Sequence, residues 1–350
     1  MFSQNMGSFS RRMLCRAIPA CLLSLALLSP QHILAWGNSG HESVAYVAWQ
    51  QMSPAARSRA IALIKLVPTL QNPEKTKSIP GYAEWVMDLP AGLSADQKNL
   101  YLFMRAATWP DSIKHQWLHD SDTPPSGSKN PDVNIGFTDT ASHGYWHFVD
   151  QGFTSDGSPV PATPVPNAAT QIVALRQAIG SNESDDLKSY DMIWLEHLVG
   201  DIHQPLHGSA RYFQGKGDEG GNTVTIKMPL AMEKKFEGTQ SKSSPRELHA
   251  FWDDLPGEGQ PAPALPDAVT FAKALPQAGA TTVKNIDPSQ WAMDSFHMAM
   301  SDAYMSPIGK GPTPAVTITQ AYYDAAMKDA KSQIALAGAR LAKLLNENLH

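Results

Sequence analysis

Residues 194–207, with the sequence WLEHLVGDIHQPLH, contain three side chains whose spacing could hold a metal ion. His197 and Asp201 are four residues apart, so on a helix both side chains leave the same face, one turn above the other. Pro205 lacks a backbone donor and disfavours helical geometry in the residue before it, so the helix should stop near His203. His207 could then approach the same region from the helix exit. The segment therefore predicts a metal site.

A second segment, residues 247–253 with the sequence ELHAFWD, repeats this spacing in His249 and Asp253. One such pair arises easily by chance. Two pairs, one of them followed by a third histidine, make a multinuclear metal site the leading hypothesis.

Two other residues allow a structural or a functional interpretation. Asp111 follows Pro110 and could cap a helix or direct its carboxylate into a site, and taken alone it favours the cap. His147 lies in residues 142–150, which could form a short strand or an extended entry to a loop. Taken alone, His147 is at least as readily a hydrogen-bonded core histidine as a ligand.

The chain begins with the features of a secretory signal. Arg11, Arg12 and Arg16 precede an apolar run over residues 20–28, and the segment closes with Ala35. The run is short for a membrane span, so cleavage after Ala35 is expected, and a twin-arginine export route stays open.

Cleavage would expose a new amino terminus at Trp36, close to His41. A free α-amino group has a pKa of about 7.7–8.0 and can lose its proton to serve as a ligand. The precursor has no such group, because Trp36 is then joined to Ala35 by an amide.

Composition limits the ligand chemistry. The chain has 350 residues, 42% hydrophobic and 17% charged, which is typical of a globular protein. Removing three arginines and no acids with the signal changes the net charge from −5 to −8, so a basic duplex-binding surface is not indicated. Both cysteines, Cys15 and Cys21, leave with the signal. Histidine and carboxylate ligands without thiolates favour zinc over calcium or magnesium.

Apolar periodicity and end signals predict mostly helices. They are expected over residues 39–52, 54–67, 99–107, 168–179, 187–203, from 244 through 253, 269–274, 290–303 and 319–349. Loops rich in proline and glycine cover residues 120–140, 155–166 and 257–266, and residues 223–227 are the one convincing strand. The sequence thus predicts an all-α single domain with long loops and at most a small β-hairpin.

Six motifs together resemble a known family. They are WGNSGH at 36–41, WPDSIK at 109–114, WHFVD at 146–150, HLVGDIHQPLH at 197–207, GGN at 220–222 and LHAFWD at 248–253. This order is similar to that of the zinc-dependent single-strand-specific nucleases, the type I nuclease/3′-nucleotidase family, which shares its fold with bacterial zinc phospholipase C. The resemblance covers residues 36–350 and implies that fold, with residues 1–35 as signal peptide.

The resemblance implies three zinc ions and nine protein ligands. By position, the first zinc would be held by Asp111, His147, His197 and Asp201, and the second by His207, His249 and Asp253. The third would be held by the amino nitrogen and carbonyl oxygen of Trp36 and by His41, with Asp201 bridging to the first. The remaining histidines His115, His119, His143 and His203 match no ligand position.

The same resemblance implies the reaction. A zinc-bound hydroxide would attack phosphorus in line and leave 5′-phosphate products. Lys114 would help neutralise the phosphate, and Asp150 would orient the water or a ligand histidine. Phe148 would stack on an unpaired base and Asn222 would contact the substrate, which explains a preference for single strands.

One departure concerns Glu219, which stands where many relatives carry a basic residue. A carboxylate that faced the site would weaken phosphate binding. The absence of mature cysteines differs from the disulfide-bearing eukaryotic members and favours a bacterial source.

These observations predict a periplasmic or secreted monomer that hydrolyses single-stranded DNA, RNA and 3′-nucleotides, with no stable protein partner and no membrane anchor. A zinc phospholipase C is one alternative, but such enzymes use a glutamate at the second zinc, where Asp253 matches the nucleases. A non-catalytic periplasmic zinc-binding protein is another.

Overall fold

The computed structural model describes residues 36–66, 89–112, 143–233, 246–257, 265–309, 311 and 314–349. All of them belong to one unit that spans residues 33–350. The expected signal peptide, residues 1–35, lies outside the described residues.

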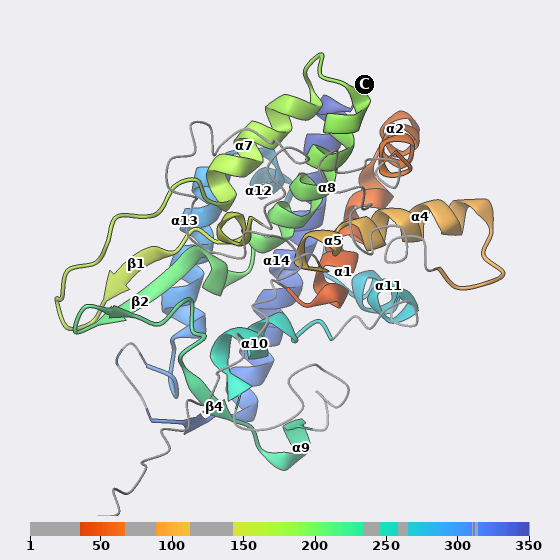
Figure 1. The fold of residues 1–350 in the computed structure, drawn as a ribbon. Coiled ribbons are helices and arrows are strands. Elements are labelled where there is room, and N and C mark those ends of the chain that lie inside the picture. The colour runs from red at the N-terminus through yellow and green to blue at the C-terminus, as the bar shows by residue number, and fades with distance from the viewer. Residues whose placement is uncertain are drawn as a thin grey trace, which may run out of the picture. The chain divides into compact units, whose positions relative to one another are not determined.

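The described chain is mainly helical, which confirms the predicted fold class (Figure 1). Its α-helices are α1 (Asn38–Gln51), α2 (Pro54–Ile64), α4 (Ala95–Ala106), α5 (Trp109–Ser112), α7 (Ala168–Ile179), α8 (Asp185–Asp201), α9 (Leu230–Glu233), α10 (Leu248–Asp253), α11 (Leu265–Lys273), α12 (Ala280–Lys284), α13 (Pro288–Met298) and α14 (Gln320–Asn348). Tighter turns form η2 (Gly144–His147) and η3 (Pro205–Gly208), and α13 continues into the π-helical η5 (Ala299–Ala303). Among these described residues, no helix combines the length and apolarity needed to cross a bilayer.

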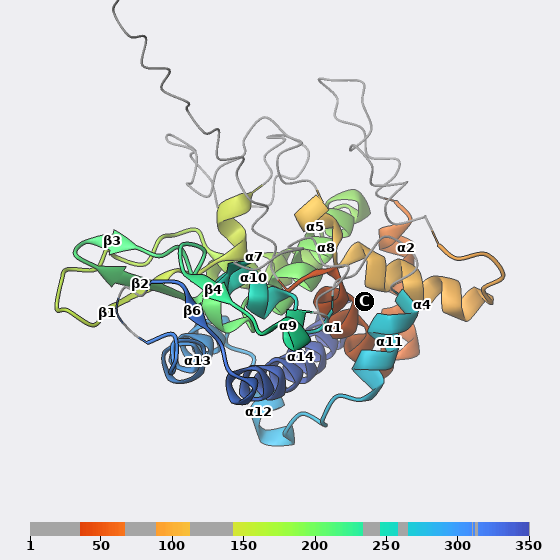
Figure 2. The same ribbon diagram turned by 90° about the horizontal axis from the view of Figure 1, so that it is seen from below.

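The strand content exceeds the small hairpin that the sequence predicts. Within the described residues, two three-stranded sheets form, in the orders β1-β2-β3 and β5-β4-β6. Figure 2 labels each of these strands except β5. Their strands are β1 (Gln151–Thr154), β2 (Ser209–Phe213), β3 (Lys216–Gly217), β4 (Thr225–Lys227), β5 (Arg246–Glu247) and β6 (Val316–Thr317). β1 pairs in parallel with β2, and β4 with β6. Such pairs join distant segments, and strands this short carry little periodicity, so the sequence pattern misses them.

Helix α8 is the central element. Asp185 and Asp186 lie in its first turn, where negative charge is favourable, and Pro205 follows shortly after its end. Every side chain from Ser189 to Asp201 is buried. α8 packs against α7, α2, α14, α1 and α5, so polar residues on it face the protein interior rather than solvent (Figure 1).

Helix α1 lies against both α14 and α8. It approaches α14 closely at Gly338, where an added Cβ would lie 2.5 Å from the Val47 Cβ. The predicted break after α1 is present, because the Ser53 hydroxyl accepts a hydrogen bond from the Ala56 N–H at the start of α2 (3.1 Å). The first turn of α1, which contains His41, is thus held against the central helix.

Three local predictions need correction. Residues 144–147 form η2 instead of a short strand or an extended entry to a loop, since His143 takes a left-handed conformation (φ 51°) and starts a tight turn. Asp111 lies inside the short helix α5 and does not cap it. The helix with His249 begins at Leu248, because Arg246 and Glu247 pair with β4 in the second sheet.

His203 is a core histidine, as its lack of a ligand match predicts. Its Nδ1 donates to the Val199 carbonyl and its Nε2 accepts from the Arg340 guanidinium, both at 2.7 Å. Burial and the charge of Arg340 lower the pKa of His203 to about 3.

This pKa predicts a loss of stability in acid. Between the unfolded pKa of about 6.5 and the folded value of about 3, the unfolded chain binds a proton that the folded chain does not. The free energy of unfolding should therefore fall as the pH decreases through this window. His203→Gln should reduce the fall, measured by urea unfolding of both proteins at pH 7 and pH 5. Identical losses in the two proteins would contradict the prediction.

Candidate metal centre

The first group of candidate ligands combines α8 with two short helices. His197 and Asp201 leave one face of α8, α5 contributes Asp111, and η2 contributes His147. The Nδ1 of His147 lies 2.9 Å from both the Asp201 Oδ2 and the His197 Nε2. The His197 Nε2 lies 3.2 Å from the Asp201 Oδ2 and 3.5 Å from the Asp111 Oδ1.

These distances fit a four-coordinate ion. The fifth measured separation, from His147 Nδ1 to Asp111 Oδ1, is 3.7 Å. A tetrahedral zinc with bonds of about 2.0–2.1 Å places its ligand atoms roughly 3.3 Å apart. The five distances between the candidate ligand atoms lie on both sides of that value, so these atoms are spaced as the ligands of one ion would be.

The second group lies on η3 and α10. His249 and Asp253 leave one face of α10, and His207 comes from η3 directly after the end of α8. The Nε2 atoms of His207 and His249 are 3.1 Å apart. The Asp253 carboxylate lies 3.5 Å from the His249 Nε2 and 4.0 Å from the His207 Nε2.

Backbone carbonyls orient these histidines. Nδ1 faces the Ala107 carbonyl in His197 (2.7 Å), the His147 carbonyl in His207 (2.8 Å) and the Gly220 carbonyl in His249 (2.8 Å). A carbonyl only accepts, so each Nδ1 carries the proton and, in the neutral ring, Nε2 presents a lone pair. Two lone pairs facing each other at 3.1 Å in His207 and His249 repel unless a proton or a cation lies between them. A ligand histidine that donates its second N–H to a carbonyl is the usual arrangement in metal sites.

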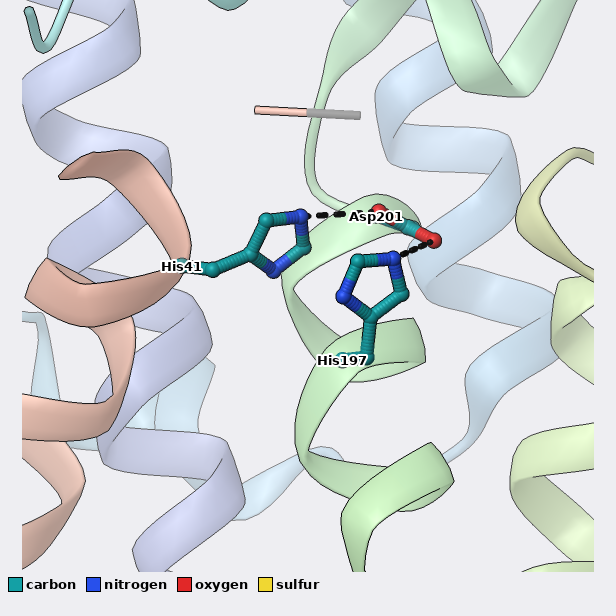
Figure 3. A group of neighbouring side chains, drawn as sticks. All are labelled: His41, His197 and Asp201. Atoms are coloured by element: carbon teal, nitrogen blue, oxygen red, sulfur yellow. Dashed lines mark ion pairs between the residues drawn. The ribbon is translucent and has the colours of Figure 1, made fainter. Parts of the chain in front are cut away.

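The third group joins α1 to the first group. His41 and Asp201 face each other from α1 and α8, with the His41 Nε2 3.3 Å from the Asp201 Oδ1 (Figure 3). The second oxygen of this carboxylate, Oδ2, lies in the first group. Asp201 therefore has the geometry of a bridging ligand. Both ring nitrogens of His41 and the Asp201 Oδ1 are buried without a hydrogen-bond partner, which fits a role as ligands of a cation.

Trp36 lies at the entry to this region. Its side chain is fully buried and packs so near Gly40 that an added Cβ there would lie 2.5 Å from the Trp36 Cβ. The next N–H, of Gly37, donates to the Asp253 carbonyl (2.9 Å). The start of the expected mature chain is thus tied to α10, which carries ligands of the second group.

Electrostatics make the first group attractive to a cation. Burial alone would raise the pKa of Asp201, but the charges and hydrogen bonds of His197 and His147 hold it well below its usual range. Burial opposes protonation of His197, yet Asp201 and Asp111 raise its pKa to about 10. The two carboxylates therefore favour a positive charge at this position, which a bound metal ion would also supply.

The predicted substrate residues lie beside the second group. The Phe148 ring is 4.6 Å from the His207 ring and 6.1 Å from the His249 ring, and Phe148 is 7% exposed. Asp150 directly precedes β1, its N–H donates to the His207 carbonyl (3.4 Å), and its charge helps raise the pKa of Tyr212 after the larger effect of burial. Lys114 lies outside the described residues.

The Gly-Gly-Asn loop supports the site through its backbone. Gly220 takes a left-handed conformation (φ 60°), and its added Cβ would lie 2.5 Å from the Leu206 carbonyl oxygen. Only glycine allows this approach, which directs the Gly220 carbonyl at His249. Asn222 bonds back to the Glu219 carbonyl through its side chain (2.7 Å), and the Glu219 side chain is exposed.

Gln204 is a site residue that the sequence analysis misses. Its Nε2 donates to the Asp253 Oδ1 (2.8 Å), and its Oε1 accepts from the Leu206 N–H (2.5 Å). It therefore holds the Asp253 carboxylate and the turn before His207 at once. Its position between Asp201 and His207 in the sequence could have indicated a role in the site. Its own residue type and neighbours do not distinguish it from a surface amide.

Gln204→Leu should weaken metal binding at the second group by about 10–100-fold, the usual cost of losing a partner behind a ligand. A competition titration with a zinc chelator measures this. Gln290→Leu removes a comparable amide contact, to Asp294 on the exposed face of α13, and should leave metal binding unchanged. Equal affinities in the two variants would show that Gln204 does not support the site.

The fold and the site define a class. The described residues form a mainly helical protein whose interior brings together three adjoining groups of histidine and aspartate side chains, His41–His197–Asp201, Asp111–His147–His197 and His207–His249–Asp253. Such donors without sulfur suit a polynuclear centre for a divalent ion such as zinc.

Comparison with known proteins names the family. The S1/P1 nuclease model matches residues 36–350. Nuclease P1 of Penicillium citrinum is 26% identical over 329 residues, which cover 89% of this chain and 97% of the relative. Endonuclease 4 of Arabidopsis thaliana is 25% identical over 338 residues, 89% of each chain, and nuclease S1 of Aspergillus oryzae is 24% identical over 280 residues, 79% of this chain and 73% of the relative. The chain belongs to the S1/P1 nuclease family and is a nuclease by class.

Proposed function

We propose that the mature chain is a zinc-dependent endonuclease that hydrolyses single-stranded DNA and RNA to 5′-phosphate products and also acts as a 3′-nucleotidase. The observation that carries the proposal is the convergence of three buried ligand groups around the end of α8 in a nuclease of this family. Zinc, when bound, supplies Lewis-acid chemistry, lowering the pKa of water and offsetting negative charge on phosphate oxygens.

The nine ligands divide among three zinc ions. Asp111, His147, His197 and Asp201 hold the first, and His207, His249 and Asp253 hold the second. The third is held by His41, by Asp201 as a bridge, and by the amino nitrogen and carbonyl oxygen of Trp36. The distances among the histidine and aspartate atoms of each group and the orientation of the rings support this division, and the role of Trp36 follows from the family resemblance.

The remaining residues position the substrate. Phe148 stacks with a base, which requires a base free of duplex pairing. Lys114 offsets the phosphate charge, Asp150 orients water or a ligand histidine, and Asn222 contacts the nucleotide. Phe148 adjoins the ring of His207, so a base stacked there would place its phosphate near the second group.

Phe148→Ala should keep every zinc and weaken nucleotide binding by roughly 5–150-fold, the value of one base–aromatic stack. Zinc content is measured by elemental analysis and binding by titration of a non-hydrolysable single-stranded oligonucleotide. Phe148→Leu keeps an apolar side chain without a ring and should lose binding to a similar degree. Full binding by the leucine variant would mean that Phe148 fills space and does not stack.

The experiment that tests the whole proposal combines zinc per mature chain with hydrolysis of single-stranded DNA, RNA and phosphatidylcholine on one sample. We expect three zinc ions and nucleic-acid hydrolysis that a chelator abolishes. Lipid turnover without nucleic-acid turnover would indicate a phospholipase C, and an intact zinc centre without any hydrolysis would indicate a zinc-binding protein.

Location follows from the expected signal at residues 1–35. We infer export to the periplasm or the medium, release by cleavage after Ala35, and a monomeric mature enzyme without a membrane anchor. Mass spectrometry of the exported protein tests the cleavage point. A mass that corresponds to a chain beginning before Trp36 would contradict it.

A further inference from the structure

His41 lacks a contact that three of the other four candidate ligand histidines have. His197, His207 and His249 each have a carbonyl behind the Nδ1 nitrogen. Neither ring nitrogen of His41 has a hydrogen-bond partner, although the side chain is completely buried. Its ring orientation therefore depends on packing and on the Asp201 carboxylate, whose Oδ1 lies 3.3 Å from the His41 Nε2.

Two neighbours on α8 form the surface on which this ring lies. One face stacks on His197, with ring centroids 3.9 Å apart and planes 13° apart. The Nδ1 edge lies over Gly200, where an added Cβ would be 2.8 Å from the His41 Nδ1 and 3.0 Å from its Cε1. Carbon atoms do not approach neighbours this closely, so any side chain at residue 200 would displace the ring.

The backbone does not explain this glycine. Gly200 lies inside a regular α-helix, one residue before its end, and does not have a positive φ. Glycine also has a lower helix propensity than alanine, so the helical backbone does not favour it at residue 200. Any other residue would fill the space beside its Cα that the His41 ring occupies.

We propose that Gly200 is a positioning residue for the third metal: the missing side chain seats His41 so that Nε2 reaches the Oδ1 of the bridging Asp201, 3.3 Å away (Figure 3). The inference rests on the proposed trinuclear zinc function. The ring has no room to retreat, since α1 is held against α14 at Gly338 and His197 covers one face of the ring. Metal sites tolerate displacements of only about 0.5 Å.

Gly200→Ala tests the inference by zinc content. The zinc content should fall from three ions per mature chain to two, because the nearest atoms to the new methyl group, apart from the adjoining residues, belong to His41. Chelator titration should show the same selective loss, independently of activity. Ser189→Ala is the matched control: it removes the bond from α8 to the Leu63 carbonyl (2.5 Å), also loosens α8, and should keep three zinc ions.

Gly200→Ala in a His41→Ala background distinguishes a steric clash with the His41 ring from a general loss of folding stability. Without the imidazole, alanine at residue 200 should raise the melting temperature, as expected for a helix interior, and zinc should stay at two in both backgrounds. If the single variant fails to fold, recovery of folding in the double variant supports the proposal, and failure of both overturns it.

Zinc content distinguishes failure of the trinuclear centre from failure of the role of Gly200. A wild-type protein with fewer than three zinc ions would overturn the proposed trinuclear function itself. Three zinc ions in both the wild-type protein and Gly200→Ala would leave that function intact and overturn the role of Gly200.

Discussion

Asp201→Asn is expected to remove more than one zinc ion and to lower hydrolysis of single-stranded DNA by more than about 100-fold, which exceeds the usual loss for a residue behind a ligand. The Asp201 Oδ2 lies 2.9 Å from the His147 Nδ1 and 3.2 Å from the His197 Nε2. Its Oδ1 lies 3.3 Å from the His41 Nε2. Asparagine replaces one of these oxygens with a donor and removes the negative charge, so both ions lose a ligand atom or its charge.

Elemental analysis and initial rates on the same preparation measure the effect. Asp191→Asn is a matched control, because Asp191 is also fully buried on α8 and burial raises the pKa of its carboxyl group well above the usual value. Asp191 belongs to none of the three candidate ligand groups, so the amide should leave zinc and activity unchanged. Full zinc content in Asp201→Asn would show that this carboxylate does not bridge two ions.

A single residue retained before Trp36 is expected to remove the third zinc and to lower activity at least about tenfold. The amide that this residue creates has no lone pair available for a metal, whereas a free amine does. Trp36 is fully buried and its neighbour Gly37 is bonded to the Asp253 carbonyl, so the extra residue cannot easily move the end of the chain elsewhere.

Two preparations of the mature chain test this effect, one beginning at Trp36 and one with an added glycine. The added glycine has no side chain, which limits steric effects, and its own amine lies one residue too far from His41. Zinc content, melting temperature and rate are compared on both. An extended form that keeps three zinc ions and full activity would refute a role for the amino terminus.

Much of the site was predictable because its chemistry is local in the chain. The pairs His197–Asp201 and His249–Asp253 have helical spacing, and the structure places each pair on one face of a helix. Helix α7 matches its predicted bounds, residues 168–179, because a capping residue, an apolar stripe and a terminal glycine all agree. The exit of His207 after Pro205 follows in the same way from proline geometry.

The positions of Asp111 and His147 were not predictable from their own surroundings. Their segments resemble a cap and a short strand, and only the order of motifs along the chain indicated otherwise. In the structure α5 and η2 both lie against α8, which brings their side chains to His197. Contacts between segments this far apart in sequence depend on tertiary packing. The local hydrophobic periodicity of a helix or strand does not predict them.

The sequence by itself thus determined the ligand types, the helical pairs and the mainly helical class, because those depend on residue chemistry and on the 3.6-residue period. Only the tertiary structure revealed the distances between the candidate ligands, the close approach of His41 to Gly200, and the contacts of Gln204 and the Gly220 carbonyl with Asp253 and His249. These contacts arise where α1, α8 and α10 meet. Their distances are set by how closely backbones and side chains can pack, which is a property of the assembled fold.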